Sequence, residues 1–348
     1  MVILIILSVL LFLVSVYAWI KLHVIRRKST RTEYSSHYIV RMKFYQAWDE
    51  LVTVQKTRQV QKGVDSNGNP IMETETYYED EVHYHGPEYY MILNSGKTIP
   101  ISGRQYSNYG HVMVSRDQFV NLHRNYYSIN GNLYINDWDG RTFTFVPITL
   151  TQNYTNPFLL TQSIFNTADI SDESAMELGL YKYPPIINHQ QSTIIGKEID
   201  EIDQRYYDHA NAKIFEKSGM RVYLLFFENK PIEIAEKQRD YWRNGNSNEI
   251  VICIGTKGEG FDIQWCHTFS WCDNNSFEVK CKQWLMTCGE FDLRKFASYM
   301  IDNADNIEKK DFADFDYLLY GKKRGLKTLA IATLLATGLI LIIMLICM

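Results

Sequence analysis

The clearest feature of the hydropathy pattern is a pair of long apolar runs at the two ends of the sequence. Residues 1–20 contain no charged side chain, and neither do residues 328–348. As an α-helix, each run would be about 30 Å long, which matches the hydrocarbon core of a bilayer. The pattern therefore predicts transmembrane helices at 1–20 and 326–348.

The polar sequence begins with a region of alternating apolar and polar residues, typical of strands, and we expect a β-rich module at 35–151. Three pairs of segments flank turn sequences, which predicts three hairpins. The pairs are 52–60 with 72–84, 89–93 with 98–102, and 125–128 with 133–136. The first pair surrounds Asn67-Gly68, which is typical of tight hairpin turns because both central residues need positive φ. A helical turn is expected at 116–123.

The pattern loses its period over residues 152–192. Asn156-Pro157 and Pro184-Pro185 disfavour regular structure at these positions. We therefore expect an extended connector here, with one short helix at 172–178.

An α/β module is predicted at 193–320. Apolar residues recur every three or four positions from Ile195 to Ile214, which predicts an amphipathic helix ending at Gly219. The continuous apolar runs 220–227 and 249–254 are typical of buried strands, and Pro231 marks the start of a helix between them. This order of elements predicts a right-handed βαβ unit with parallel strands.

Two antiparallel strands are expected next, at 261–271 and 277–284, followed by a closing helix at 291–303. Leu293, Phe296 and Met300 would lie on the inner side of that helix. The predicted fold class is α+β, with two terminal transmembrane helices flanking a β-rich module and an α/β module.

Residues 194–304 resemble the TPM domain, an α/β fold of membrane-attached bacterial and plastid proteins. The features that carry the resemblance are the helix before Gly219, the strand Arg221-Val-Tyr-Leu-Leu-Phe226, the helix ending at Trp242 and the strand after Asn248. After Gly260 the family's Gly-rich segment is replaced by a Trp- and Cys-rich one. The motif Gly86-Pro-Glu-Tyr-Tyr90 is similar to one in uncharacterised two-anchor bacterial membrane proteins.

The resemblance implies a membrane-associated role, because TPM-domain proteins are described as phosphatases, calcium binders or assembly factors of membrane complexes. None of the family's acidic site residues matches a position of this sequence.

Basic residues gather on the inner side of both apolar runs. They are Lys21, Arg26, Arg27, Lys28 and Arg31 after the first, and Lys322, Lys323, Arg324 and Lys327 before the second. By the positive-inside rule, both clusters predict a two-pass protein whose polar region is cytoplasmic. A cleaved signal peptide ending near Ala18 is the alternative, but its n-region should be positively charged, and no Lys or Arg precedes Ala18.

The two predicted membrane helices are expected to pack as an antiparallel pair, because the polar region begins and ends at the same membrane face. Ser8 and Ser15 of the first helix would meet a small-residue stripe at Ala332 and Ala336 of the second. The alternative is that these small residues pair two copies of the chain.

Glu81, His83 and His85 are the best candidate metal ligands, since alternation on a strand would place all three on one face. A third ligand segment is lacking, so a polar strand face is the preferred interpretation, and no metal or other cofactor is predicted. Five cysteines between Cys253 and Cys288 lack the close Cys pairs of structural zinc, and core packing is preferred for them. A disulfide is the alternative in an oxidising compartment.

Ligands of open α/β sheets gather at the carboxyl ends of parallel strands. The candidate ligand-binding residues are therefore Glu228, Lys230, Thr256, Lys257 and Glu259, which follow the two predicted parallel strands. No motif of a catalytic nucleophile is present, and no catalytic residue is predicted.

The function favoured by the sequence is that of a membrane-anchored interaction or assembly protein rather than an enzyme. Its partners would be the lipid bilayer, through both ends of the chain, and either another protein or further copies of itself. The formal net charge of -4 argues against nucleic acid. The alternative, implied by the TPM resemblance alone, is a membrane-bound, phosphatase-like hydrolase.

Overall fold

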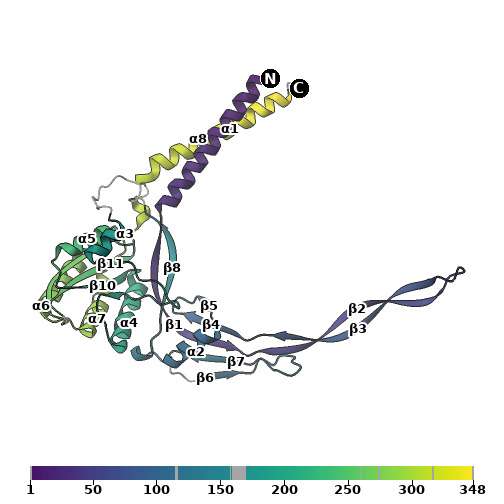
Figure 1. Ribbon diagram of the computed structural model, residues 1–348, viewed down its shortest axis with the longest axis horizontal. Helices are drawn as coiled ribbons and strands as arrows, with labels where there is room; N and C mark the ends of the chain where they lie inside the picture. Colours follow the sequence, from purple (N-terminus) through teal and green to yellow (C-terminus); the bar gives the residue numbers. More distant parts are fainter. Residues whose placement is uncertain are drawn as a thin grey trace. The chain divides into compact units, whose positions relative to one another are not determined.

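The computed structural model describes residues 2–113, 117–156, 158, 170–258, 260–272, 275–315 and 317–346. The fold is mixed α+β, as predicted, and the chain divides into two compact units (Figure 1). Unit 1 comprises Met1–Ser36 and Thr149–Met348, and unit 2 comprises His37–Ile148.

The centre of unit 1 is a four-stranded sheet with the strand order β12-β11-β10-β9. Its strands are β9 (Ile194–Ile195), β10 (Arg221–Glu228), β11 (Glu249–Thr256) and β12 (Ile263–Ser270). β10 is parallel to both β9 and β11, whereas β12 is antiparallel to β11. The predicted parallel pairing of the strands around helix α5 (Glu233–Trp242) is therefore confirmed.

Both faces of this sheet are covered, which explains the continuous apolar runs of β10 and β11. Val222, Leu224 and Phe226 point into one apolar core and the residues between them into another. The first core is covered by α4 (Glu201–Ser218), α6 (Asn275–Cys288) and α7 (Leu293–Asp302). The second is covered by α5 and by α3 (Asp172–Leu178), a short helix that the sequence predicted.

One predicted strand of unit 1 is wrong. Residues 277–284, expected as a strand, belong to helix α6. Phe277, Cys281 and Leu285 are all buried and are spaced four residues apart, whereas Val279 is exposed. The alternation of the first few residues therefore concealed a helical period.

The amphipathic helix predicted to begin near Ile195 begins later. Ile194 and Ile195 form β9 instead, and α4 starts after Asp200, whose carboxylate accepts the backbone N–H of Ile202 (2.9 Å). Its end is as predicted, because Gly219 adopts the left-handed conformation (φ 69°) that terminates many helices.

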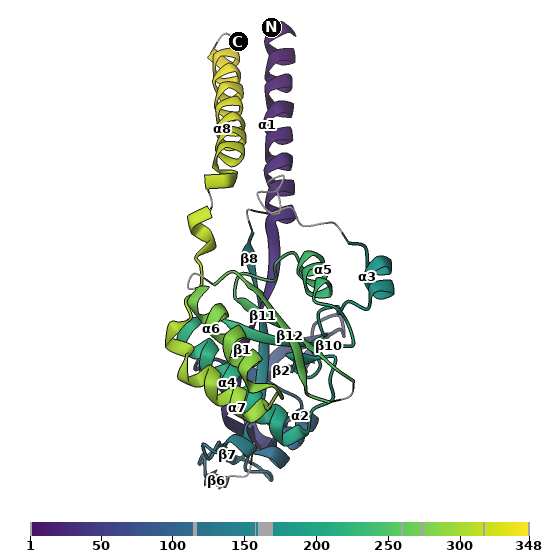
Figure 2. The same cartoon turned by 90° about the vertical axis from the view of Figure 1, so that its left-hand side faces the viewer.

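The two terminal helices are α1 (Val2–Ser29) and α8 (Tyr317–Ile346), and both are long and apolar enough to cross a membrane. They lie side by side, with the two chain ends at the same end of the pair (Figure 2). The hydroxyl of Ser15 donates a hydrogen bond to the carbonyl of Ala330 (3.0 Å). Ala18 and Ala330 are fully buried.

The packing face of α1 agrees with expectation, since Ser8 and Ser15 are buried. The packing face of α8 agrees only in part. Among its residues with described side chains, Ala330, Thr333 and Thr337 are buried, Ala336 is half-buried and Ala332 is exposed. The hydroxyls of Thr333 and Thr337 donate hydrogen bonds to backbone carbonyls of their own helix. Both residues can therefore pack against α1 as small side chains without an unpaired polar group.

Unit 2 is built on a sheet with the strand order β5-β4-β1-β7-β6, and β8 also pairs with β1. The strands of this sheet are β1 (Thr30–Tyr45), β4 (Glu88–Leu93), β5 (Thr98–Pro100), β6 (Asp117–Val120), β7 (Leu133–Asp137) and β8 (Pro147–Thr155). Residues 30–36 of β1 and 149–155 of β8 belong to unit 1. The predicted β4–β5 hairpin is confirmed. Ile39, Met42, Met91 and Leu93 form the buried centre of this sheet.

The third predicted hairpin is wrong in its first strand. β7 pairs with β6, in which Phe119 lies opposite Tyr134, and residues 125–128 form no strand. Instead, the N–H groups of Ser128 and Ile129 bind the buried carboxylate of Asp49 (2.6 and 2.8 Å). The conformation of this segment is therefore determined by its hydrogen bonds to Asp49, about eighty residues away in the sequence.

The helical turn predicted at 116–123 is also wrong. β6 occupies Asp117–Val120, residue 116 lies outside the described residues, and the helix of this region is α2 (Gly103–Val112). Ser102 and Gln105 cap α2 reciprocally, in a capping box that the sequence pattern Ser-x-x-Gln contains.

The remaining two strands of unit 2, β2 (Trp48–Val64) and β3 (Pro70–His85), form a separate two-stranded sheet. They pair antiparallel along their whole length, and the predicted first hairpin is confirmed. Figure 1 shows them as a long twisted ribbon. We call this element the β2–β3 ribbon.

Candidate functional site

The structure brings four of the five predicted ligand-binding residues to one edge of the unit 1 sheet. β10 and β11 end together, with Glu228 opposite Thr256. The N–H of Asn229 donates to the carbonyl of Thr256 (2.9 Å), and the side chain of Asn229 accepts the N–H of Gly258 (3.0 Å). Lys230 and Lys257 flank these contacts, and Glu259 lies outside the described residues.

These four side chains differ in exposure. Glu228, Lys230 and Lys257 are exposed, and the backbone N–H and the side chain of Asn229 join the two strand ends. Thr256 is buried, with 2% of its surface exposed, and its hydroxyl has no hydrogen-bond partner among the described residues. The structure therefore places these four residues at one edge of the sheet, and their role in ligand binding stays a prediction.

A pocket of about 660 Å³ lies at the same carboxyl edge, where the chain leaves β9 and where α4 and α7 begin. Most of the charged residues in its lining are acidic. The charged lining residues are Glu198, Asp200, Asp203, Glu290, Asp292, Arg294 and Lys295. None of the four predicted ligand-binding residues that the structure describes lines it.

Two of these carboxylates are occupied as helix caps. Asp200 caps α4, and Asp292 caps α7 by accepting the N–H of Lys295 (3.0 Å). The backbone N–H of Lys295 is also the main reason why the pKa of Asp292 lies below its ordinary value. Both carboxylates therefore stabilise helix ends that would otherwise leave N–H groups without partners.

A third carboxylate is occupied by an ion pair between the two helices. Arg294 Nε on α7 donates to Asp203 on α4 (2.5 Å), and this hydrogen bond raises the pKa of the guanidinium. The lowered pKa keeps Asp292 ionised at neutral pH, and Asp203 is held by its ion pair with Arg294. The arrangement can attract cations and basic groups, and it fixes α4 against α7.

Of the three candidate metal ligands on β3, Glu81 and His83 lie close together, whereas His85 contacts other residues. Glu81 binds Lys56 (2.6 Å), and its distance to His83 is 3.6 Å. His85 is directed to Glu50 (3.2 Å) and stacks on Trp48, with ring centroids 4.2 Å apart. Across the part of the chain that the structure describes, no group of three or more His, Cys, Asp or Glu residues is placed to hold a metal ion.

The cysteines lie mainly in the core of unit 1. Cys253, Cys266, Cys272 and Cys281 are buried, Cys288 is exposed, and no disulfide links any of these five described residues. Burial raises the pKa of the Cys266 thiol to about 12, so this group is not a nucleophile at neutral pH.

Sequence reasoning missed a group of buried charges at the opposite, amino edge of the sheet. Glu33 of β1 is almost fully buried and binds Ser247, Gln152 (2.5 Å) and Lys309 (3.2 Å). Glu249 is fully buried as well, and burial is the main cause that raises its pKa. A single sequence carries no periodic signal for such contacts, because the partners are far apart along the chain.

Arg221 is a third buried charge at this edge. Its guanidinium donates to the hydroxyl of Thr149 and the carbonyl of Gln191 (both 3.3 Å), and the ring of Tyr223 lies 5.3 Å from it. These bonds join β8 and the segment before β9 to the first residue of β10. The cluster therefore acts as an internal support of unit 1.

Comparison of this chain with models of known protein families gives no match, and comparison with curated proteins gives none either. The TPM resemblance of residues 194–304 stays a prediction, because the parallel βαβ arrangement is common to many α/β folds.

Proposed function

We propose that this chain is a two-pass membrane protein that uses the β2–β3 ribbon to bind a protein partner. The two helices that could span a membrane support the first half of the proposal. No group of potential metal ligands is gathered among the described residues, which favours binding over metal-dependent catalysis. The observation that carries the proposal is the composition of the ribbon.

The two strands of the ribbon are unusually long for a hairpin. Its strands have 17 and 16 residues, whereas strands of globular proteins usually have 3 to 10. An isolated two-stranded ribbon is marginally stable in water, and its outer edges present backbone groups that can pair with another chain. A bound partner would stabilise the ribbon and could pair with the backbone groups of its outer edges.

One face of the ribbon is stabilised by cross-strand ion pairs. Lys56 bridges Glu79 (2.8 Å) and Glu81 (2.6 Å), and Arg58 binds Glu75 (2.9 Å). Because side chains alternate along a strand, these residues share a face. We call it the ion-pair face.

The opposite face, which we call the Tyr78 face, exposes uncharged side chains almost throughout. Leu51 pairs with Val82 and Gln55 with Tyr78, and Tyr78 is 68% exposed. The only carboxylate of its central part, Asp80, accepts a hydrogen bond from Thr53 (2.6 Å). Exposed tyrosine and aliphatic side chains among Thr and Gln are typical of the centre of a protein interface, from which charge is depleted.

Site-specific photo-crosslinking tests this proposal, with a matched control in the next residue. A photoreactive phenylalanine analogue at Tyr78 should yield discrete protein adducts in native membranes. The same substitution at Tyr77, whose ring lies under Arg58 on the ion-pair face, should yield few. An adduct of twice the chain mass would identify a second copy as the partner. Equal yields at both positions, or none at Tyr78, would refute the binding role of this face.

The orientation across the membrane is part of the proposal. The basic residues beside both helices support a cytoplasmic location for the region between them. A cysteine introduced at Ser66, in the turn between β2 and β3, should resist a membrane-impermeant thiol reagent in intact cells and react after permeabilisation. Reaction in intact cells would place the ribbon outside.

A further inference from the structure

A second pocket lies between α1 and α8, and its composition differs from that of the acidic pocket. Its volume is about 710 Å³, within the range of small-molecule sites. Trp19, His23 and Arg26 of α1 line it together with Arg324 and Lys327 of α8. No carboxylate is present among these described lining residues.

The spacing of the lining residues shows that the pocket is a product of two helix faces. Trp19, Leu22, His23 and Arg26 are spaced i, i+3, i+4 and i+7, so they form one stripe of α1. Arg324 and Lys327 are spaced i, i+3 on α8. The stripe begins one turn beyond Ser15, whose contact with Ala330 is the close approach of the two helices.

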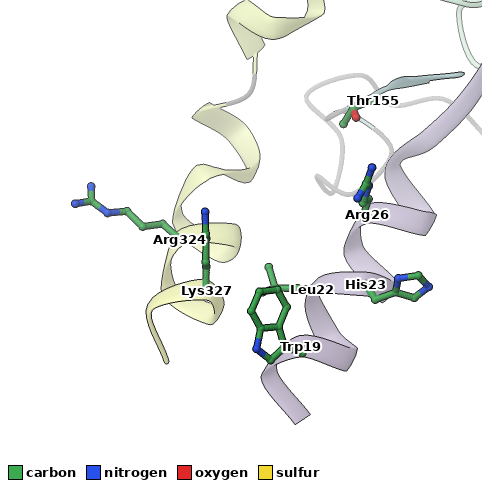
Figure 3. Close-up of a pocket in the computed structure, with 7 residues that line it drawn as sticks. All are labelled: Trp19, Leu22, His23, Arg26, Thr155, Arg324 and Lys327. Atoms are coloured by element: carbon green, nitrogen blue, oxygen red, sulfur yellow. The ribbon is translucent and has the colours of Figure 1, made fainter. Parts of the chain in front are cut away.

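The arrangement in Figure 3 separates a basic rim from an apolar base. Arg26 and Lys327 both extend in the direction of Thr155, at the end of β8, whereas Trp19 and Leu22 lie toward the membrane-helix side of the pocket. Arg324 extends away from α1. Arg26 and Lys327 are therefore the two cations most directly available to one bound anion.

We propose that this pocket binds the phosphate-bearing headgroup of an anionic phospholipid. Arg26 and Lys327 donate to the phosphate, and Trp19 and Leu22 contact the glycerol and the first carbons of the acyl chains. Two cations on neighbouring helices repel one another, and a shared anion removes this repulsion. The proposal rests on the proposed function in one respect, namely that α1 and α8 span a bilayer.

The position of the pocket along the helices specifies a lipid rather than a soluble anion. Tryptophan is enriched where the hydrocarbon core meets the headgroups, and Trp19 lies between the uncharged run of α1 and its basic last turn. A lipid bound here presents its phosphate at the level of Arg26 and its acyl chains at the level of Trp19. A free phosphate would leave Trp19 and Leu22 without a partner.

Native mass spectrometry of the full chain, released from detergent micelles that contain phosphatidylglycerol or phosphatidylcholine, tests the proposal. The chain should retain phosphatidylglycerol in preference, and the double variant Arg26→Gln with Lys327→Gln should weaken this binding about tenfold, as expected for the loss of charge-assisted contacts. The matched control is Arg27→Gln with Lys28→Gln, which removes the same charge from the same membrane side but outside the pocket.

Three outcomes would overturn the site. Equal retention of the two lipids, equal losses in the pocket and control variants, or full displacement of the lipid by soluble glycerol phosphate would each do so. Trp19→Ala should also weaken lipid binding, which a purely ionic site would not show. If carbonate washing removes the chain from membranes, the proposed function itself fails, whereas a carbonate-resistant chain without lipid preference refutes only the pocket.

Discussion

At the scale of single residues, the charges that matter most in this protein are the buried ones. Glu33, Arg221 and Glu249 are all at most 2% exposed, and each contacts a group from a distant segment; for Glu249 this group is the hydroxyl of Tyr183. Burying a charge without such partners would cost several kcal/mol, so these contacts must form together for unit 1 to fold.

In unit 2 the buried, hydrogen-bonded charge is the carboxylate of Asp49. Its lowered pKa makes the stability of the folded chain depend on pH. The N–H of Ile129, followed by further bonds from Ser128, lowers the pKa of its carboxyl from 3.8 to about 2. A depressed pKa in the folded state means that Asp49 contributes stability above pH 4 and that this contribution is lost as the pH falls toward 2.

We expect Asp49→Asn to lower the melting temperature of the detergent-solubilised chain at pH 7 and to flatten its dependence on pH between about 4 and 2. Ser128→Ala, which removes one of the bonds to Asp49, should have a smaller effect in the same direction. Melting curves followed by circular dichroism over this pH range provide the measurement. An unchanged acid profile in Asp49→Asn would show that another carboxyl controls it.

At the scale of elements, the parallel pair β10–β11 is the centre of unit 1. Ile252 is fully buried in the middle of β11, within the core covered by α4, α6 and α7. The sequence predicted this strand from its uninterrupted apolar run, and the prediction holds because both sheet faces are covered.

Ile252→Ala should destabilise the chain by about 2–5 kcal/mol, through lost burial and the cavity left behind. Ile202→Ala is the matched control, because it makes the same chemical change on α4 at a side chain that is 48% exposed. Its effect should stay within about 0.5 kcal/mol. Chemical denaturation of both variants measures the difference, and a negligible loss for Ile252→Ala would contradict the burial of β11.

The two wrong strand predictions, at residues 277–284 and 125–128, also have their cause in the packing of elements. A segment of eight residues whose apolar positions fall at both two- and four-residue spacing fits either period, and only the core against which it packs decides between them. Residues 125–128 contain strand-forming side chains but no partner strand, because β6 occupies the edge of β7. In both cases tertiary contacts override the local preference.

At the scale of the whole molecule, the pairing of α1 with α8 brings the two ends of the sequence together. The pair rests on small side chains and on the bond between Ser15 and the Ala330 carbonyl. Small residues allow the close backbone approach on which helix association in lipid depends.

Cysteines at Ser15 and Ala330 should therefore form a disulfide within one chain, in a background with Cys288 and Cys347 changed to serine. Cysteines at Leu13 and Leu335, which are exposed on the outer sides of the two helices, are the control pair and should not react with each other. Mobility on a non-reducing gel distinguishes the products. Crosslinks found only between chains would show that the helices pair two copies instead.

The sequence by itself determined the elements that depend on local pattern. The two apolar helices, the β2–β3 and β4–β5 hairpins, α3, and the parallel βαβ arrangement follow from periodicity, turn residues and run length, which are properties of neighbouring residues. The edge of the sheet where ligands were expected was located by the same reasoning, since strand direction fixes it.

Only the tertiary structure decided which side chains meet. It placed His85 beside Glu50 and buried Ala330 rather than Ala332. It brought Asp200 and Asp292, the capping residues of α4 and α7, into the pocket at the sheet edge. It also joined Arg26 to Lys327 across three hundred residues of sequence in one basic pocket. The physical reason is that packing, burial and shared charge are pairwise properties of distant segments, and a single sequence records the members of each pair but not their pairing.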